Sequence, residues 1–336
     1  MAHPARREPS APARTHVMVT GGLGNQLFQY AAALDVARGN EVVLWPALGA
    51  PRCHDGVTAD LLRLPLPAAV HVGALRVSGV LRLLAQKASG YMLRIGVIGS
   101  ALERDHRYRA LAAWAASLAV LPALRRRVRI RAAVGIGFDP VATGPGAEPL
   151  LLGYFQTWRH ASATHVRPTL TAALEGVDTE WFREMQALAA AEAPIIVHVR
   201  LGDYRKEPGL GIIEPAYYEV AVAEARALHP DSRIWLFSDE PDAAIAMLPA
   251  DTPEPRVVNP PDASTPPAEL LRVMTLGRCY VLANSTFGWW AALLAADATR
   301  TVTVPEPWFV IGEQPRDLIP SDWQRRSRST GAEVRS

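Results

Sequence analysis

The chain has only two cysteines, two lysines and no long apolar run among its 336 residues. Cys53 and Cys279 lie far apart in apolar surroundings, which argues against a disulfide framework and against a cysteine metal centre. No uninterrupted apolar stretch reaches the roughly 18 residues that a membrane span needs, and the nearest approach, residues 110–124, contains a serine and a proline. These absences favour a cytoplasmic protein that is held together by its core.

Two further signals are missing. No Asp-x-Asp pair occurs in the sequence, so we expect no metal ion and no cofactor. Residues 1–14 are rich in proline, arginine and alanine and lack the apolar centre of a signal peptide, which predicts a disordered tail. With 49% hydrophobic residues, the chain can bury a sizeable core, and its length suits two α/β domains.

Charge is nearly balanced overall, with a formal net of +2, but it is uneven along the chain. Residues 71–131 contain twelve lysines and arginines against Glu103 and Asp105, a local net of +10. The segment is interpreted either as a solvated basic face or as a peripheral contact with anionic lipid or a lipid-linked glycan. Aromatic residues are too sparse there, and nucleic-acid motifs too scarce, to favour nucleic-acid binding.

Alternating strand and helix patterns predict parallel sheets. We expect domains at residues 15–185 and 186–325, with a second disordered tail at 326–336. A helical stretch is expected over 70–124, and loops over 138–149 and 253–267. The expected strands are 16–19, 41–44, 194–199, 233–237, 279–282 and 301–304, and the expected helices are one ending near residue 39, then 217–228, 242–247, 268–276 and 287–296.

The most informative motif is His-Val-Arg-Leu-Gly-Asp-Tyr at residues 198–204, where an apolar strand enters a loop. Side chains alternate along a strand, so His198 and Arg200 point the same way at its carboxyl end, the edge at which open α/β sheets bind ligands. A guanidinium there suits a diphosphate because it binds phosphate through two parallel hydrogen bonds. The alternative is a structural turn in which Arg200 pairs with Asp203.

A glycine-rich loop, Gly-Gly-Leu-Gly-Asn-Gln at residues 21–26, joins the first strand to an alanine-rich helix. It departs from a dinucleotide-binding fingerprint because Leu27 replaces the third glycine. Asn25 and Gln26 place amides in the loop, and amides suit sugar hydroxyls better than a pyrophosphate. The alternative is a tight turn without a ligand.

Residues 283–290, Ala-Asn-Ser-Thr-Phe-Gly-Trp-Trp, join the strand at 279–282 to the next helix. Asn284 and Ser285 are interpreted either as helix caps or as part of an anion site at the helix start. Trp289 and Trp290 are expected in the core.

A third strand end carries Ser238, Asp239 and Glu240. We expect Glu240 to cap the helix that Pro241 begins. For Asp239, capping and hydrogen bonding to guanine or ribose both remain open.

Taken in order, these motifs resemble the bacterial α-1,2-fucosyltransferases of glycosyltransferase family 11. The family pattern usually has a second arginine after the first, where this chain has Leu201. The resemblance covers most of residues 16–324 and runs through residues 21–30, 153–158 (Gly-Tyr-Phe-Gln-Thr-Trp), 198–204, 237–239, 283–290 and 317–323.

The resemblance implies a GT-B-like fold, with two Rossmann-like domains whose parallel sheets face a cleft. Residues 15–185 would be the acceptor side, and residues 186–325 would bind GDP-fucose. The implied reaction is inverting transfer of L-fucose from GDP-fucose to the 2-hydroxyl of a terminal galactose, without metal. A fucosyltransferase of another linkage and a catalytically silent nucleotide- or glycan-binding relative are the alternatives.

The expected site follows from these motifs. We expect catalytic roles for Arg200, Asn25 and Asp203, with Glu214 or His198 as other candidates for the general base. The expected donor-binding residues are His198, Arg200, Asp239, Asn284, Ser285, Thr286 and Phe287, and the expected sugar or acceptor loop comprises Gly22, Gly24, Asn25 and Gln26.

Overall fold

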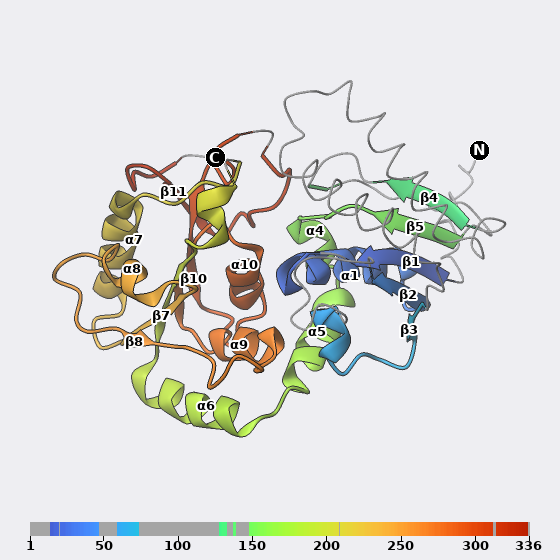
Figure 1. The fold of residues 1–336 in the computed structure, drawn as a ribbon, viewed down its shortest axis with the longest axis horizontal. Helices are drawn as coiled ribbons and strands as arrows, with labels where there is room; N and C mark the ends of the chain where they lie inside the picture. Colours follow the sequence, from blue (N-terminus) through green and yellow to red (C-terminus); the bar gives the residue numbers. More distant parts are fainter. Residues whose placement is uncertain are drawn as a thin grey trace, which may run out of the picture.

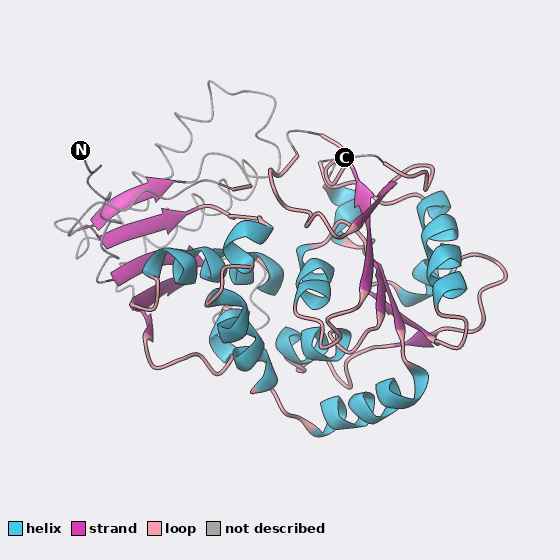
Figure 2. Cartoon of the chain, turned by 180° about the vertical axis from the view of Figure 1, so that it is seen from behind, coloured by secondary structure: helices cyan, strands magenta, loops and turns pink. Residues whose placement is uncertain are grey.

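A computed structural model describes residues 14–19, 21–46, 59–73, 128–132, 137–138, 148–207, 209–311 and 314–334 of the chain. Its strands form two separate parallel sheets, each with helices packed on it (Figures 1 and 2). The predicted α/β class with two parallel sheets is therefore confirmed. Among the described residues, no helix is long and apolar enough to cross a membrane.

The first sheet has the strand order β3-β2-β1-β5-β4, with β1 at its centre. After Arg14, every residue of β1 is buried, as is typical of a parallel strand covered on both faces. The elements of this half are β1 (Arg14–Val19), α1 (Leu23–Ala37), β2 (Glu41–Pro46), η1 (Asp60–Arg63), β3 (Val70–Val72), β4 (Val128–Ala132), β5 (Glu148–Leu152), α4 (Trp158–Ala161) and α5 (Val166–Glu175).

The second sheet has the order β11-β10-β9-β6-β7-β8 and also contains only parallel pairs. Its elements are α6 (Glu180–Glu192), β6 (Ile195–Val199), η4 (Asp203–Lys206), α7 (Pro215–Leu228), β7 (Ile234–Ser238), α8 (Pro241–Ile245), β8 (Arg256–Val257), α9 (Pro267–Met274), β9 (Cys279–Val281), α10 (Thr286–Leu293), β10 (Thr301–Glu306) and β11 (Gln324–Ser327).

Strand β6 shows how alternation directs the functional side chains. Ile195 and Val197 pack with α7 on one face of the sheet, whereas Ile196 joins the core on the face covered by α9 and α10. His198 follows the parity of Ile196 and lies against Gly288 of α10. Because side chains alternate along the strand, the His-x-Arg motif is directed toward the face of the sheet that α10 covers.

The two halves share one continuous core through α1 and α10, which lie next to each other between the sheets (Figure 1). The Phe28 ring packs against both Trp289 and Trp290, at centroid distances of 4.5 and 4.8 Å. The Trp290 indole N–H donates to the Gly24 carbonyl at 2.8 Å. Both tryptophans are fully buried, so their predicted place in the core is confirmed.

Some predicted elements differ in the structure. β3 occupies residues 70–72, where a helical stretch was expected to begin, while residues 74–127 lie outside the described part. β5 begins within the expected loop 138–149, and the short strand β8 lies within the expected loop 253–267.

The expected disordered tail at residues 326–336 is wrong as far as residue 334. β11 pairs with β10 through residue 327, and Arg326 forms two hydrogen bonds with Glu224 at 2.8 and 3.1 Å. Arg328 is buried, and Gly331 packs on Val220 of α7. At the other end Arg14 already belongs to β1, and the rest of the expected tail at 1–14 lies outside the described residues.

Candidate active site

Both sheets have a point at which the strand order reverses. In the second sheet it lies between β6 and β9, because β7 and β8 continue on one side and β10 and β11 on the other. The loops after these two strands carry Arg200 and residues 284–286. Ligands of open α/β sheets bind at such switch points, at the carboxyl ends of the strands.

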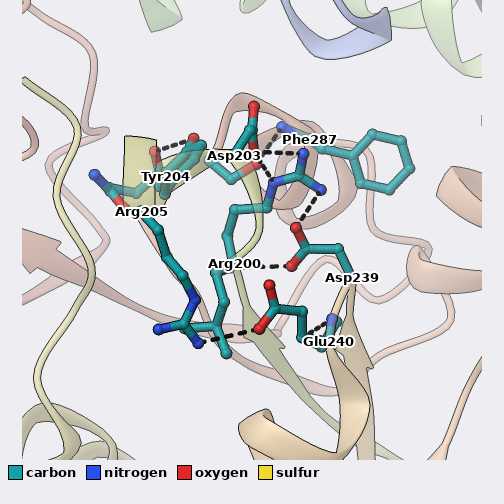
Figure 3. A network of polar contacts seen from close by, with 11 residues as sticks. Arg200, Asp203, Tyr204, Arg205, Asp239, Glu240 and Phe287 are labelled. Carbon is teal, nitrogen blue, oxygen red and sulfur yellow. Dashed lines mark hydrogen bonds and ion pairs between the residues drawn. The ribbon is translucent and has the colours of Figure 1, made fainter. Parts of the chain in front are cut away.

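Arg200 is held between two carboxylates at this switch point (Figure 3). Its Nε and one terminal nitrogen donate to Asp203 Oδ1 at 3.0 and 2.8 Å. The other terminal nitrogen lies 3.3 Å from Asp239 Oδ2, and the guanidinium carbon lies 5.8 Å from the centre of the Tyr204 ring. The side chain is 33% exposed and has five N–H donors, so it can offer further hydrogen bonds to an anion.

Asp239 links β7 to the turn that carries Arg200. One of its oxygens accepts from the Leu201 N–H at 3.0 Å, and the other faces the Arg200 guanidinium. Glu240 stands at the N-cap position of α8, but its side chain makes no capping bond. It pairs with Arg205 at 3.0 Å instead, so the capping role expected for Glu240 is wrong.

His198 is buried beside Arg200, against α10. A Cβ built on Gly288 would lie 2.5 Å from its Nδ1, so only glycine allows the imidazole this place. Burial, followed by the nearby Arg200 charge, lowers the pKa of His198 to about 4. The imidazole is therefore neutral at pH 7, and its burial does not suit the alternative role of general base.

The segment after β9 is fixed mainly by its own contacts. The Asn284 amide donates to the carbonyls of Leu210 and Trp308, both at 2.9 Å, which ties its nitrogen to the protein rather than to a ligand. Ser285 caps α10 by accepting from the Phe287 N–H, which matches the capping alternative, while its expected donor-binding role stays a prediction. Thr286 contacts the glycine loop of the other half of the molecule.

The first sheet reverses its strand order between β1 and β5. The glycine-rich loop follows β1, and residues 153–157 follow β5. Asn25 Oδ1 accepts from the Gln156 amide at 2.9 Å, so an amide pair spans the switch point. The sequence motifs did not single out Gln156 as a site residue, although it lies in a segment that carries the family resemblance.

Phe155 precedes Gln156 and has φ +51°, a conformation that is strained for an aromatic residue and that tends to occur at functional sites. The buried Gln156 Oε1 has no hydrogen-bond partner among the described residues. Both features make this segment a candidate part of the site.

Two residues of the expected sugar loop have structural tasks. Gln26 is fully buried, donates to the Gly21 carbonyl at 2.7 Å and accepts from the Leu61 N–H at 2.8 Å, so its amide does not face a ligand. Gly24 lies against α10, where a Cβ would be 2.6 Å from Thr286 Oγ1. Gly22 is the N-cap residue of α1, and its carbonyl accepts from the Asn25 N–H at 3.0 Å.

No group of three or more potential metal ligands occurs in the part of the chain that the structure describes. The switch point of the second sheet instead presents a guanidinium with two carboxylates. That of the first sheet presents neutral amides beside the start of α1. Together they suit a ligand with an anionic part and a hydroxyl-rich part.

Comparisons with known proteins show similarity to glycosyltransferases. Residues 151–309 match the sequence model of glycosyl transferase family 11, which confirms the predicted resemblance. The chain is also 28% identical over 131 residues to the O-antigen biosynthesis glycosyltransferase WbnK of Escherichia coli. That alignment covers 38% of this chain and 42% of the relative, so the chain matches less than half of the relative's length.

Solved structures of glycosyltransferases are similar at low identity. The α-1,6-fucosyltransferase NodZ soaked with GDP-fucose shares 16% identity, with a TM-score of 0.45 and coverage of 84% of this chain and 93% of that one. The ADP-heptose heptosyltransferase II of E. coli shares 11%, with a TM-score of 0.42 and coverage of 93% and 89%.

Proposed function

We propose that this protein is an inverting fucosyltransferase that moves L-fucose from GDP-fucose to the 2-hydroxyl of a terminal galactose. The observation that carries the proposal is the Arg200 guanidinium, which is held by Asp203 and Asp239 at the switch point of the second sheet and remains one-third exposed. The family match over residues 151–309 covers this site.

Arg200 would stabilise the charge that develops on the departing GDP. A donor that is already oriented before the reaction needs no reorganisation in the transition state, and Asp203 and Asp239 supply that orientation. The positive end of the α10 dipole would add to the positive potential. No protein-bound metal is part of this proposal.

The acceptor side would use the amide pair of Asn25 and Gln156. Asn25 is partly exposed at the start of α1 and would orient a sugar hydroxyl. Asp203 is our candidate for the group that receives the proton of the acceptor hydroxyl, and an oxocarbenium-like transition state needs little help from a base.

The decisive experiment offers GDP-fucose to the protein with a panel of galactose-ended acceptors and identifies the product linkage by NMR. We expect an α-1,2 product. A product of a different linkage would overturn the proposed α-1,2 linkage but keep the proposal of a fucosyltransferase. Binding of GDP-fucose without turnover would favour the catalytically silent binding protein instead.

Nucleotide choice tests the role of Asp239. We expect calorimetry to show tighter binding of GDP than of UDP, ADP or NAD. If Asp239 forms hydrogen bonds with guanine, Asp239→Asn should lower the affinity for GDP more than the affinity for UDP. If Asp239 only orients Arg200, as its contacts favour, the substitution should lower the affinity for both nucleotides equally.

The basic segment at residues 71–131 lies largely outside the described residues, and its membrane role is a separate proposal. If it binds anionic lipid, the protein should sediment with phosphatidylglycerol vesicles at low salt. It should be released at about 0.5 M salt, because screening shortens the reach of exposed charges to a few ångströms. No sedimentation at low salt would leave it as a solvated basic face.

A further inference from the structure

A second arginine, remote in sequence from the His-x-Arg motif, lies buried beneath the loops of the site. Arg328 follows β11 in the segment that was expected to be a disordered tail, and it is only 8% exposed. Its backbone is fixed on both sides, because its N–H donates to the Glu306 carbonyl at 3.0 Å and its carbonyl accepts from the Glu214 N–H at 3.1 Å. Its position is therefore part of the fold.

The Arg328 guanidinium is surrounded by main-chain carbonyls. One terminal nitrogen donates to Leu210 and Ile212 at 3.0 and 3.2 Å, and the other approaches Pro307 and Trp308, both at 3.4 Å. The first two carbonyls belong to the loop that follows the His-x-Arg turn, and the last two follow β10. Arg328 thus joins two loops of the same sheet.

The same carbonyls lead directly to the candidate site. Leu210 and Trp308 also accept from the Asn284 amide, and the Asn284 carbonyl accepts from the Tyr204 hydroxyl at 3.1 Å. Tyr204 in turn packs beside the Arg200 guanidinium. A continuous set of contacts therefore joins Arg328 to Arg200 through backbone and side-chain groups.

The hydrogen bonds of Arg328 do not by themselves explain why a charged side chain is buried here. The ion pairs that the described C-terminal segment makes belong to its neighbours, Arg325 with Glu306 and Arg326 with Glu224, and not to Arg328. Burial lowers its pKa, with Glu214 the main opposing influence. A buried charge without a close partner is costly, and a neutral donor could bind carbonyls without that cost.

We propose that Arg328 is a positioning residue of the nucleotide-sugar site, whose buried charge is balanced by the diphosphate of the bound donor. It holds the Leu210–Ile212 loop and Asn284 in place behind Arg200. The inference rests on the proposed function, since it requires a nucleoside diphosphate at the His-x-Arg motif.

The test uses Arg328→Met, Arg328→Lys and the matched control Arg326→Met. Arg326 lies two residues earlier and pairs with Glu224, so its removal also deletes an arginine from the C-terminal segment. GDP affinity is measured by calorimetry, together with the rise in thermal midpoint that saturating GDP produces in each variant.

We expect Arg328→Met to bind GDP about tenfold more weakly than the native chain and to lose part of the GDP-induced rise in midpoint. Arg328→Lys should restore part of the affinity because it keeps the charge without the planar fork. Arg326→Met should bind GDP normally. Circular dichroism checks that each variant is folded, and Arg328→Lys alone decides the matter if Arg328→Met does not fold.

Native GDP affinity in both Arg328 variants would overturn the inference and leave the proposed function intact, even if their midpoints without GDP were lower. Equal weakening in the Arg326 control would also overturn it, because the effect would then belong to the whole segment. Absence of GDP binding by the native chain would remove the proposed function, and the inference with it.

Discussion

The carboxyl-end edges of the two sheets carry different chemistry. At the β6/β9 switch point, the charged Arg200 side chain lies between the carboxylates of Asp203 and Asp239. At the β1/β5 switch point, Asn25 and Gln156 meet through neutral amides. The same topological feature therefore holds a guanidinium between carboxylates in one sheet and a pair of neutral amides in the other. A donor diphosphate and a sugar would be divided between the two sheets in this way.

The two edges also differ in how they are built. Charges at the β6/β9 edge are oriented by ion pairs between neighbouring loops, whereas the β1/β5 edge depends on a strained backbone at Phe155 and on close packing of α1 against α10. Substitutions that change charge and changes of pH should therefore affect the β6/β9 edge most. Substitutions that change side-chain size should affect the β1/β5 edge most.

The largest effect should follow removal of the guanidinium. Arg200→Ala should lower turnover by roughly 100-fold or more, since one preorganised donor to transition-state charge contributes about 3 kcal/mol. Arg200→Lys should recover little, because an ammonium cannot reproduce the planar fork. Steady-state kinetics with and without EDTA measure both points, and activity is expected to survive the chelator.

Arg205→Ala is the matched control for that experiment. Arg205 lies on the same turn but is about half exposed and pairs with Glu240 at the surface. Near-native turnover in Arg200→Ala, combined with reversible loss of activity in EDTA, would contradict the proposed chemistry.

Acid should weaken the charged edge through His198. Its folded pKa of about 4 lies below the 6.5 of an unfolded chain, so the unfolded state binds more protons between these values. Stability is therefore fully present above pH 6.5 and declines as pH falls toward 4, by about 2 kcal/mol between pH 7 and pH 5.

Urea unfolding at several pH values tests this. Between pH 5 and pH 7, His198→Gln should reduce the dependence of the free energy of unfolding on pH. Asn25→Ala, a change at the amide edge, should leave that dependence as it is in the native chain. An unchanged slope in His198→Gln would show that His198 is already protonated in the folded protein.

The local sequence pattern predicted most strands of the second sheet. Strands β6 and β9 are short apolar runs that end in polar loops, and their predicted and observed bounds differ by one residue at one end. β11 was missed because Gln324–Ser327 has no apolar pattern. Its place is set by pairing with β10, which local sequence does not contain.

The position of a candidate site residue was predictable where its own place at a strand end decides it, and not where distant partners decide it. Arg200 at a strand end suggested an anion site from its own chemistry. Gln26 and Asn284 have the same amide group as Asn25, yet their partners, Leu61 and Leu210, lie 35 and 74 residues away. Only the fold shows which amide remains partly exposed.

Packing of α1 on α10 should tolerate no side chain at Gly24. Gly24→Ala would place its Cβ 2.6 Å from Thr286 Oγ1 and 2.8 Å from the Phe287 nitrogen, and such overpacking costs about 1–3 kcal/mol. Gly22→Ala is the matched control, because nothing lies within 4 Å of its Cβ and its φ is −73°. Chemical denaturation compares the two, and equal losses would mean that helix capping at α1, not packing, sets the cost.

The smallest effect should come from the amide pair. Gln156→Met keeps the length of the side chain but removes the bond to Asn25, a loss of about 1 kcal/mol for a neutral hydrogen bond, or roughly fivefold. If the amide edge serves the acceptor, this loss should raise the KM for a galactose-ended acceptor and leave the KM for GDP-fucose unchanged. Gln324→Met makes the same chemical change on the edge strand of the other sheet and should alter neither constant. A rise in the donor KM would instead assign the amide pair to the fucose of the donor, and the division of substrates between the two edges would then be wrong.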